Sequence, residues 1–499
     1  MSSNVAHYRH TIRAHWEADR LDLALAEAWK AYDAAPDDQV AKAQVAELLR
    51  AAPREITADR LPSLERLLSD SNIDPGSIAP AGWRYLQRFS DLFSAPASDP
   101  PSDADQSVLA KQLEANTFAR KLLAHDPVTD IRAELALTRL RRWLCLSGRW
   151  RDFPLSADAL IRQAALNEGA WSFDAEERAR LDQDDSAAIE PAYRPRRPGA
   201  DGRSVASDAV TRAVAEQYEA WPYPQWLRVT AAESTTLADR VRTLDPDGPD
   251  TIPPAAEILI AGCGTGRQAA LAALRHPDAR ITAIDISEAS LRYAATRCDE
   301  AGLSDISFRV LDLHRARELG RDFDAVFCTG VLHHLPDPEQ GWAALTEVLK
   351  PGGVMHLMIY SRLARLTVRA LRASIADLDK GVVDDDLLRE VRRRIIARNP
   401  SGAPTSRDFY SLSGVHDLLL HRHEDPFDVP RIQRALGRLG LDLIHFKLPT
   451  PHHDVLYRAE NPHDPLHRDF AAWSKAEQRN PRLFAGMYSF WCRKPVASP

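Results

Sequence analysis

The spacing of apolar residues divides the chain into a helical first part and an alternating second part. Over residues 1–195, apolar residues recur mainly at helical spacing, as in the segments 21–49, 113–150 and 157–181. From residue 209 onward, short apolar runs alternate with helical segments. This alternation predicts a mostly parallel sheet with helices on both faces. We therefore expect an all-helical domain followed by an α/β domain.

Seven short apolar runs in the second part are predicted to be strands of this sheet. A helical stretch at about 361–430 interrupts the alternation and is expected to be an insertion within the α/β domain, which spans residues 209–499. The predicted strands are Glu257–Ala261, Arg280–Asp285, Ile306–Leu311, Ala325–Cys328, Gly353–Tyr360, Leu441–Lys447 and Met487–Cys492.

The domain boundary is expected in the segment 190–208, which contains several prolines and glycines and is typical of a linker. We place the all-helical domain at 1–195 and the linker itself at 196–208. Residues from about 205 onward contain all the predicted strands, so they are expected to fold alone. A second segment rich in proline, serine and aspartate, 95–107, is predicted to be a surface loop within the helical domain.

One unit of the helical part is similar to a tetratricopeptide repeat. Ala24, Ala28, Ala31 and Pro36 match the second helix and closing turn of that repeat. Arrays of such repeats need about three or more units to be stable, and no further unit can be recognised in the sequence. Both a true repeat array and a degenerate helical bundle therefore stay open.

Composition narrows the class of protein. A chain of 499 residues is long enough for two or three domains, and its net charge of −7 argues against a general nucleic-acid binder. The five cysteines are scattered without a CxxC pair, so neither a disulfide framework nor a cysteine zinc site is expected. The first residues lack an apolar signal segment, and no apolar run is long enough to span a membrane. We therefore expect a cytoplasmic protein that binds neither nucleic acid nor membrane.

The strongest chemical signal is a glycine-rich loop between a predicted strand and a predicted helix. The segment 257–266 ends in Gly262, Gly264 and Gly266, and glycine lets the chain turn tightly and bring bare backbone to a ligand. The next strand ends at Asp285, where a carboxylate can accept hydrogen bonds from ribose hydroxyls. The NAD fingerprint would need glycine at the position of Arg267, so the spacing favours S-adenosylmethionine over NAD.

Five motifs follow one another as they do in a known family: AGCGTG at 261–266, AIDIS at 283–287, LDL at 311–313, FDAVFCTGVLHHL at 323–335 and LKPGG at 349–353. In this order they resemble the class I S-adenosylmethionine-dependent methyltransferases, which have a Rossmann-like fold. The segments 165–168, 217–226, 360–361 and 411–419 resemble bacterial proteins that join a tetratricopeptide-like region to such a methyltransferase.

The resemblance implies a set of residues that bind the cofactor. Asp312 would hold the adenine amino group. Many members have an acidic residue two positions before the first glycine, but Ile260 stands here, so backbone carbonyls would have to bind the cofactor's ammonium group. The implied cofactor residues are Gly262, Cys263, Gly264, Gly266, Asp285, Ile286, Asp312, Leu313 and Thr329.

Candidate catalytic residues lie at the carboxyl ends of the fourth and fifth predicted strands. His333 and His334 follow the fourth strand and Tyr360 ends the fifth, at the sheet edge where ligands bind in such folds. One of the histidines is a candidate general base, and Tyr360 is a candidate substrate contact. The alternative for the histidines is packing against the following helix.

Aromatic residues before the first strand form a second candidate feature. They are expected to act either as a lid over the active site or as a structural latch between domains, because prolines preset the extended shape of this segment. The residues are Tyr218, Trp221, Tyr223 and Trp226.

Two further patterns, one of arginines and one of histidines, can be explained either by a binding role or by ordinary surface residues. Arginines recur at helical spacing at positions 362, 365, 369 and 372, either as a solvated face paired with acids or as a grip on an acidic substrate. His421 and His423 could ligate one metal if the chain is extended there. No cysteine joins them and no zinc spacing is matched, so no metal site is expected, and these histidines are expected at the surface or in the substrate pocket.

Three hypotheses on function follow. The first is a methyltransferase acting on a small molecule, with the helical domain closing the site or mediating assembly. The second is a methyltransferase acting on a peptide or protein that the helical domain captures as a partner. The third is an inactive cofactor-binding scaffold, which the intact glycine loop and the two acids, Asp285 and Asp312, oppose.

Overall fold

The chain folds into two compact units. One, the helical unit, comprises Met1–Tyr8, Leu21–Pro198 and Leu371–Leu420, and the other, the sheet unit, comprises Arg9–Arg20, Gly199–Ala370 and His421–Pro499. The computed structural model describes residues 3–51, 56–93, 102–183, 187–195, 208–231, 234–378, 383–398 and 406–496.

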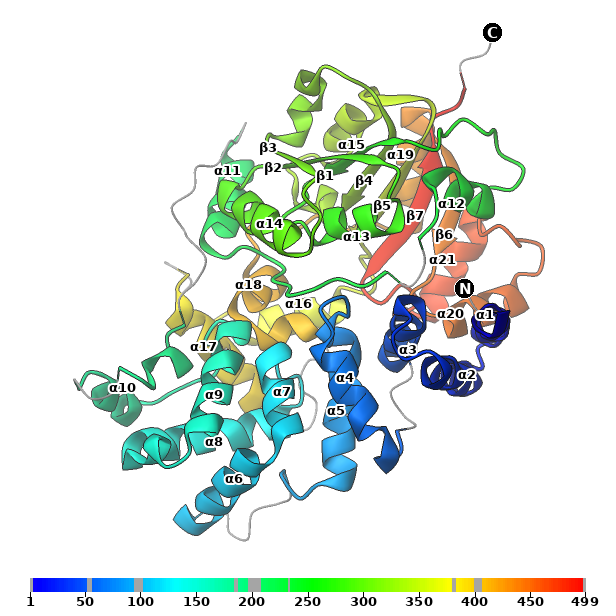
Figure 1. Cartoon of the computed structure of the whole chain (residues 1–499). Helices are drawn as coiled ribbons and strands as arrows, with labels where there is room; N and C mark the ends of the chain where they lie inside the picture. Colours follow the sequence, from blue (N-terminus) through cyan, green and yellow to red (C-terminus); the bar gives the residue numbers. More distant parts are fainter. Residues whose placement is uncertain are drawn as a thin grey trace. The chain divides into compact units, whose positions relative to one another are not determined.

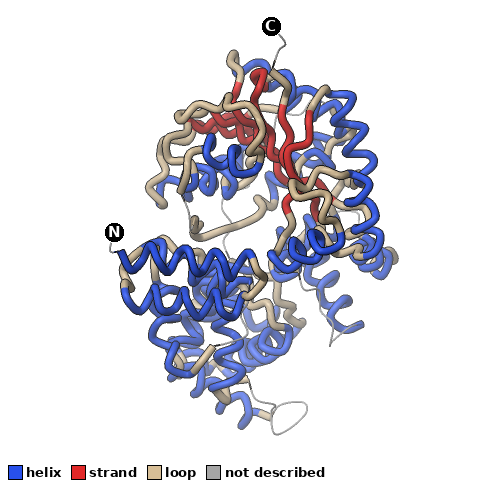
Figure 2. The backbone as a smooth tube through the Cα atoms, turned by 90° about the vertical axis from the view of Figure 1, so that its right-hand side faces the viewer, coloured by secondary structure: helices blue, strands red, loops and turns tan. Residues whose placement is uncertain are grey.

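The described part of the helical unit contains helices and connecting segments but no strand, as the sequence predicts (Figure 2). Local signals set the helix ends: Ser102 and Asp105 form a capping box at the start of α6, and Gly148 ends α8 in a left-handed conformation. Its helices are α2 (Leu21–Ala34), α3 (Gln39–Ala51), α4 (Leu61–Ser69), α5 (Pro75–Phe89), α6 (Asp103–Ala115), α7 (Thr117–His125), α8 (Ile131–Ser147), α9 (Pro154–Asn167), α10 (Ala175–Leu181), α17 (Asp385–Arg398) and α18 (Leu412–Leu420), while α1 (Ser3–Glu17) and α16 (Leu366–Ser374) span the division between the units.

Residues 371–420 group with the helical unit, although the sequence pattern placed them in an insertion of the α/β domain. Buried polar contacts explain the difference. The Arg392 guanidinium on α17 donates to both carboxylate oxygens of Glu134 on α8, at 2.9 and 2.8 Å. The Ser413 amide and hydroxyl on α18 both donate to the Glu168 carboxylate. A cut at residue 205 therefore divides the helical unit instead of separating two domains.

The predicted linker 196–208 lies almost entirely outside the described residues, as does most of the predicted loop 95–107. The described end of that loop differs from the prediction, because Ser102 caps α6 and the following residues are helical. Capping by the Ser102 hydroxyl and the Asp105 carboxylate satisfies backbone N–H groups that a loop would leave to water.

The sheet unit is built on seven strands in the order β3-β2-β1-β4-β5-β7-β6. The first five strands along the chain are parallel, and β7 runs antiparallel between β5 and β6 (Figure 1). The observed strands lie at or close to the predicted positions. They are β1 (Glu257–Ala261), β2 (Arg280–Asp285), β3 (Ser307–Val310), β4 (Phe323–Thr329), β5 (Leu349–Tyr360), β6 (Asp442–Lys447) and β7 (Met487–Arg493).

Helices cover both faces of this sheet, which explains why its central strands are continuously apolar. One core holds apolar residues of α12, α13 and α14, and the other holds those of α15, α19 and α21, so both faces are excluded from water. The helices of this unit are α11 (Ala209–Ala220), α12 (Leu237–Leu244), α13 (Arg267–Arg275), α14 (Glu288–Glu300), α15 (Pro338–Glu347), α19 (Val429–Leu439), α20 (Pro451–Glu460) and α21 (Phe470–Arg479).

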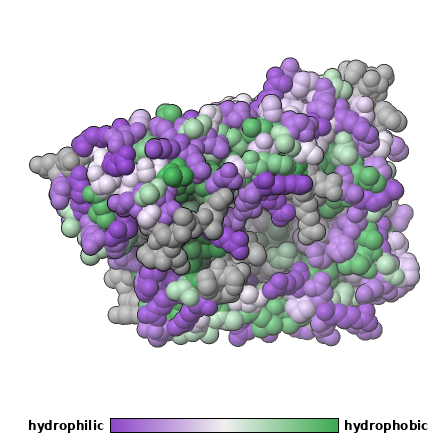
Figure 3. Space-filling model, turned by 90° about the horizontal axis from the view of Figure 1, so that it is seen from below, coloured by the Kyte–Doolittle hydropathy of each residue, from purple (hydrophilic) through white to green (hydrophobic). Residues whose placement is uncertain are grey.

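The surface is mainly hydrophilic on the face drawn in Figure 3, and the described helices are not of the membrane-spanning kind. On the face drawn in Figure 3, apolar residues form small groups among more numerous hydrophilic ones. Within the described part of the chain, no helix combines the length and the apolar character that a membrane crossing requires.

Candidate active site

The glycine loop links β1 to α13 and has the geometry that its sequence predicts. Gly262, Gly264 and Gly266 all have positive φ angles, of 66°, 52° and 81°, which side chains other than glycine rarely adopt. A Cβ at Gly262 would lie 2.4 Å from a Val331 methyl group, and one at Gly266 would lie 2.5 Å from Ala294. The loop is therefore bare backbone held between the element after β4 and helix α14.

Asp285 at the end of β2 is bound directly to this loop. Its carboxylate accepts hydrogen bonds from the backbone N–H of Gly264 at 2.7 Å and of Ser287 at 2.9 Å. Burial raises the pKa of Asp285, and these backbone donors oppose the rise. The structure thus brings together a glycine-lined turn and a buried carboxylate, which are the two features that a nucleoside with a free ribose needs.

The remaining predicted cofactor residues lie at the same edge of the parallel strands. Asp312 follows β3 and is buried, as is the neighbouring Leu313. Thr329 ends β4, and its buried hydroxyl has no hydrogen-bond partner among the residues that the structure describes. Such an orphaned hydroxyl at a ligand-binding sheet edge fits a site that a bound molecule completes. Ile286 directly follows Asp285 and is half-buried, and the Cys263 thiol is buried in the glycine loop.

The aromatic–proline segment packs on the glycine loop. The Trp226 indole N–H donates to the Thr265 carbonyl at 2.8 Å, and the Thr265 hydroxyl donates to the Pro224 carbonyl. The Trp226 backbone is held by the Tyr293 hydroxyl, which accepts from its N–H and donates to its carbonyl. Trp226 is buried, whereas Trp221 and Tyr223 are half-buried.

His333 is completely buried and joins two strand ends. Its Nδ1 accepts the backbone N–H of Tyr360 at 3.1 Å, and the Tyr360 ring lies against its ring with centroids 3.9 Å apart. Burial, reinforced by nearby positive charges, lowers the pKa of His333 well below its ordinary value. The ring is therefore neutral, and because Nδ1 accepts, its proton is on Nε2. His333 can donate a hydrogen bond in this arrangement but cannot accept a proton at Nε2.

His334 uses its Nδ1 in the opposite way. Its Nδ1 lies 2.8 Å from the His423 carbonyl oxygen, and since a carbonyl can only accept, Nδ1 carries the proton. The two predicted histidines therefore use Nδ1 in opposite roles, since His333 accepts a hydrogen bond there and His334 donates one.

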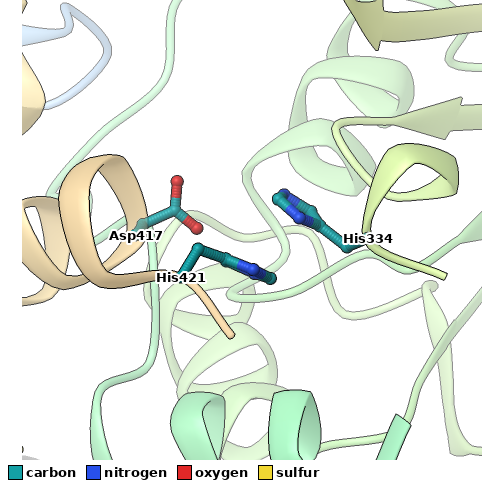
Figure 4. A group of neighbouring side chains, drawn as sticks. All are labelled: His334, Asp417 and His421. Carbon is teal, nitrogen blue, oxygen red and sulfur yellow. The ribbon is translucent and has the colours of Figure 1, made fainter. Parts of the chain in front are cut away.

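A third histidine, His421, lies face to face with His334, with ring centroids 3.6 Å apart. Figure 4 shows His334 reaching from the turn after β4 and His421 following α18, with Asp417 one helical turn earlier in the chain. His421 Nδ1 accepts the His423 N–H, so its Nε2–H points to the Tyr218 hydroxyl at 3.3 Å. The five residues Tyr218, His333, His334, Tyr360 and His421 are called the histidine–tyrosine cluster below.

An ion pair adjoins this cluster. Arg365 and Glu424 are both buried, and the guanidinium binds the carboxylate through two nitrogens while lying 4.0 Å from the centroid of the Tyr360 ring. Arg362, in contrast, is exposed and lies 3.9 Å from Asp428. Two of the four arginines at helical spacing, Arg362 and Arg365, are thus paired with acids, and Arg365 is not part of a solvated face.

Sequence reasoning missed His421 as a partner of the predicted site residues. The pattern around it predicted surface or substrate-pocket histidines, with a metal pair of His421 and His423 as the alternative. In the structure His423 contributes its backbone to the cluster through its N–H and carbonyl groups. Tyr218 and His421 are 203 positions apart, so local spacing contains no signal for their contact.

Comparisons with known proteins agree with this geometry. Residues 258–353 match the model of the methyltransferase domain family. An uncharacterized protein of Synechococcus sp. is 31% identical over 263 residues, covering 48% of this chain and 60% of its own length. The ubiquinone biosynthesis O-methyltransferase of Paracidovorax citrulli is 34% identical over 115 residues, covering 23% of this chain and 48% of its own.

Among solved structures, PKMT2 from Rickettsia typhi in complex with AdoHcy is similar with a TM-score of 0.39 and 16% identity, over 56% of each chain. The chain spans between about half and three fifths of the length of the two curated relatives described above. The matched model over residues 258–353, the strand order and the glycine loop support a class I methyltransferase fold for the sheet unit, with S-adenosylmethionine as its cofactor.

Proposed function

We propose that the whole protein is an S-adenosylmethionine-dependent methyltransferase that methylates a small molecule at a hydroxyl oxygen. The observation that carries the activity is the hydrogen bond between the Gly264 N–H and the buried Asp285 carboxylate, which joins the two main cofactor elements. The names of two relatives, a ubiquinone biosynthesis O-methyltransferase and a trans-aconitate 2-methyltransferase, support a small acceptor. The first of these names also supports transfer to oxygen.

The residues present fit the cofactor. The glycine loop offers backbone where any Cβ would strain the chain, Asp285 offers acceptors for ribose hydroxyls, and Thr329 offers an unpaired hydroxyl among the described residues. Asp312 would accept from the adenine amino group. With Ile260 in place of an acid, backbone carbonyls at the ends of β1 and β4 would hold the ammonium group.

The histidine–tyrosine cluster is proposed to face the acceptor. S-adenosylmethionine supplies a methyl group activated by its sulfonium, so the chain has to align the acceptor and take up its proton. His334 Nε2 is the proposed proton acceptor, and stacking with His421 holds its ring in place. His333 and Tyr360 brace the strand ends, since the His333 ring binds the Tyr360 backbone.

Burial supports a small acceptor over a peptide. His333, His334 and His421 are at most 8% exposed, as suits groups that act on a molecule enclosed by the site. A peptide or protein acceptor is the second candidate, favoured by the α2–α3 helix pair, in which Ala24, Ala28 and Ala31 are buried as in a tetratricopeptide repeat. An inactive scaffold is the third, and the intact loop and acids oppose it.

A transfer assay separates the first two candidates. The intact chain, given S-adenosylmethionine with a radioactive methyl group, is incubated separately with the small-molecule and the macromolecular fraction of a cell extract. We expect label in small molecules that is released by ether cleavage, as a methyl group on a hydroxyl oxygen is. The Asp285→Ala variant provides the background. Label confined to the macromolecular fraction would contradict the small acceptor and favour a captured protein.

For the aromatic segment we propose a latch at Trp226 and a pocket wall at Tyr223. Replacing Trp226 by phenylalanine removes its hydrogen bond to the Thr265 carbonyl, so cofactor affinity should fall about fivefold, the worth of one neutral hydrogen bond. The melting temperature should fall as well. Tyr223→Ala should leave the cofactor affinity nearly unchanged, because the half-buried Tyr223 side chain is assigned to the acceptor.

Calorimetry with S-adenosylhomocysteine and thermal denaturation check both variants, with Trp143→Phe in the helical unit as a control for general loss of an indole. Unchanged affinity and stability in Trp226→Phe would contradict the latch.

A further inference from the structure

His314 contacts the carboxylate of Asp312, which is proposed to accept a hydrogen bond from the adenine amino group of the cofactor. Its ring Nδ1 lies 2.9 Å from Asp312 Oδ1, and its backbone N–H donates to the same oxygen at 3.0 Å. The Asp312 side chain is 2% exposed and that of His314 is 20% exposed. The imidazole therefore covers one oxygen of a buried carboxylate from the solvent side.

The charges around His314 strengthen this contact. Its pKa is raised, first by the hydrogen bond to Asp312 and then by the negative charges of Asp312, Asp208 and Asp337, while burial opposes the rise. A donor next to a carboxylate makes a stronger hydrogen bond when it is charged. The charges of Asp208 and Asp337 thus add to the attraction between His314 and Asp312.

The role of Asp312 as a helix N-cap does not explain its contact with the His314 ring. Asp312 is the N-cap of the short turn Leu313–Leu319, and the backbone N–H of His314 already satisfies that role. The terminal torsion of a carboxylate is broad and roughly twofold. The His314 ring adds a donor to Oδ1 beside the backbone N–H, which restricts this torsion and the position of Oδ2.

We propose that His314 is a positioning residue that holds Asp312 in the orientation that selects adenine over bases without its amino group. This inference rests on the proposed function, since it assumes that Asp312 meets the adenine of the cofactor. Both contacts engage Oδ1, so the adenine amino group would donate to Oδ2. A base with a keto group at the same position would instead place an acceptor against a carboxylate, which is unfavourable.

Calorimetry with two probes tests the proposal: S-adenosylhomocysteine, which has the amino group, and S-inosylhomocysteine, which has a keto group in its place. We expect the intact chain to prefer the adenosyl probe by at least about tenfold, as a site built for one donor does. His314→Ala should weaken the adenosyl probe about fivefold, since one hydrogen bond to a carboxylate is lost, and leave the inosyl probe nearly unchanged.

A double-mutant cycle separates positioning from general damage. If His314 acts through Asp312, the double variant Asp312→Ala with His314→Ala should bind the adenosyl probe no more weakly than Asp312→Ala alone. His314→Asn, whose amide N–H₂ can still donate to Oδ1, should recover most of the preference, and this conservative variant also serves if His314→Ala folds poorly. Arg315→Ala, an exposed neighbour on the same turn, is the matched control.

Equal weakening of both probes in His314→Ala, or additive losses in the cycle, would overturn the positioning role. Failure of the proposed function is a different result, in which the intact chain binds neither probe. Loss of affinity in the Asn variant equal to that in the Ala variant would also count against the proposal, because the donor would then be irrelevant.

Discussion

Replacing Glu134 by alanine is expected to lower the free energy of unfolding of the helical unit by about 3–5 kcal/mol, because it leaves the buried Arg392 charge unpaired. In the intact chain Arg392 is 1% exposed and donates to both Glu134 oxygens, to the Phe409 carbonyl at 2.8 Å and to the Ala170 carbonyl at 2.7 Å. Neutral carbonyls alone cannot compensate a guanidinium that is removed from water.

Denaturant unfolding followed by circular dichroism measures this loss. Glu176→Ala is the matched control, because Glu176 also pairs with an arginine, Arg142, but both side chains are exposed. Exposed pairs contribute about 0–1 kcal/mol, so this variant should unfold almost like the intact chain. Replacing Glu134 and Arg392 together by leucine and methionine should be less harmful than Glu134→Ala alone. Equal stability of Glu134→Ala and Glu176→Ala would contradict the burial of the pair.

The same contacts revise the expectation that residues from about 205 onward fold alone. Such a fragment keeps α17 and α18 but lacks Glu134 and Glu168, their buried partners. We expect the fragment to aggregate or to be only partly folded. A soluble fragment that melts cooperatively would show that residues 371–420 do not depend on the rest of the helical unit.

Asp285→Ala is expected to weaken S-adenosylhomocysteine binding by about 2–3 kcal/mol, since hydrogen bonds from two ribose hydroxyls to a charged acceptor are lost. The variant also frees the Gly264 N–H, whose partner is the Asp285 carboxylate at 2.7 Å, so the glycine loop should become less ordered. Asp285→Asn keeps the shape and one acceptor and should bind with intermediate affinity.

Calorimetry measures the three affinities, and circular dichroism confirms that each variant is folded. Asp305→Ala, an exposed aspartate before β3, is the control for loss of a negative charge and should bind like the intact chain. A folded Asp285→Ala variant with full affinity would mean that another residue holds the ribose.

The sequence predicted those parts of the fold and the site that depend on local patterns. The bounds of β1 and β2 match the prediction, because a continuous apolar run between turns reports burial on both faces of a sheet. The glycine loop and Asp285 were also predictable, since glycine spacing and the end of the next strand are local features.

Contacts between distant segments could not be predicted in this way. Arg392 belongs to a highly charged helix, α17, with five arginines and three acids. Its partner Glu134 nevertheless lies 258 positions away, and both are buried. The stacking of His421 on His334 likewise depends on how the chain returns to the sheet after α18. Periodicity describes which face of an element is apolar but not which element covers it.

The most direct test of the central claim is calorimetric titration of the intact chain with S-adenosylmethionine in the presence of a metal chelator, with NADH titrated in parallel. The glycine loop, Asp285 and Asp312 predict binding of S-adenosylmethionine at micromolar affinity and no heat with NADH. Binding of NADH without any binding of S-adenosylmethionine would contradict the account.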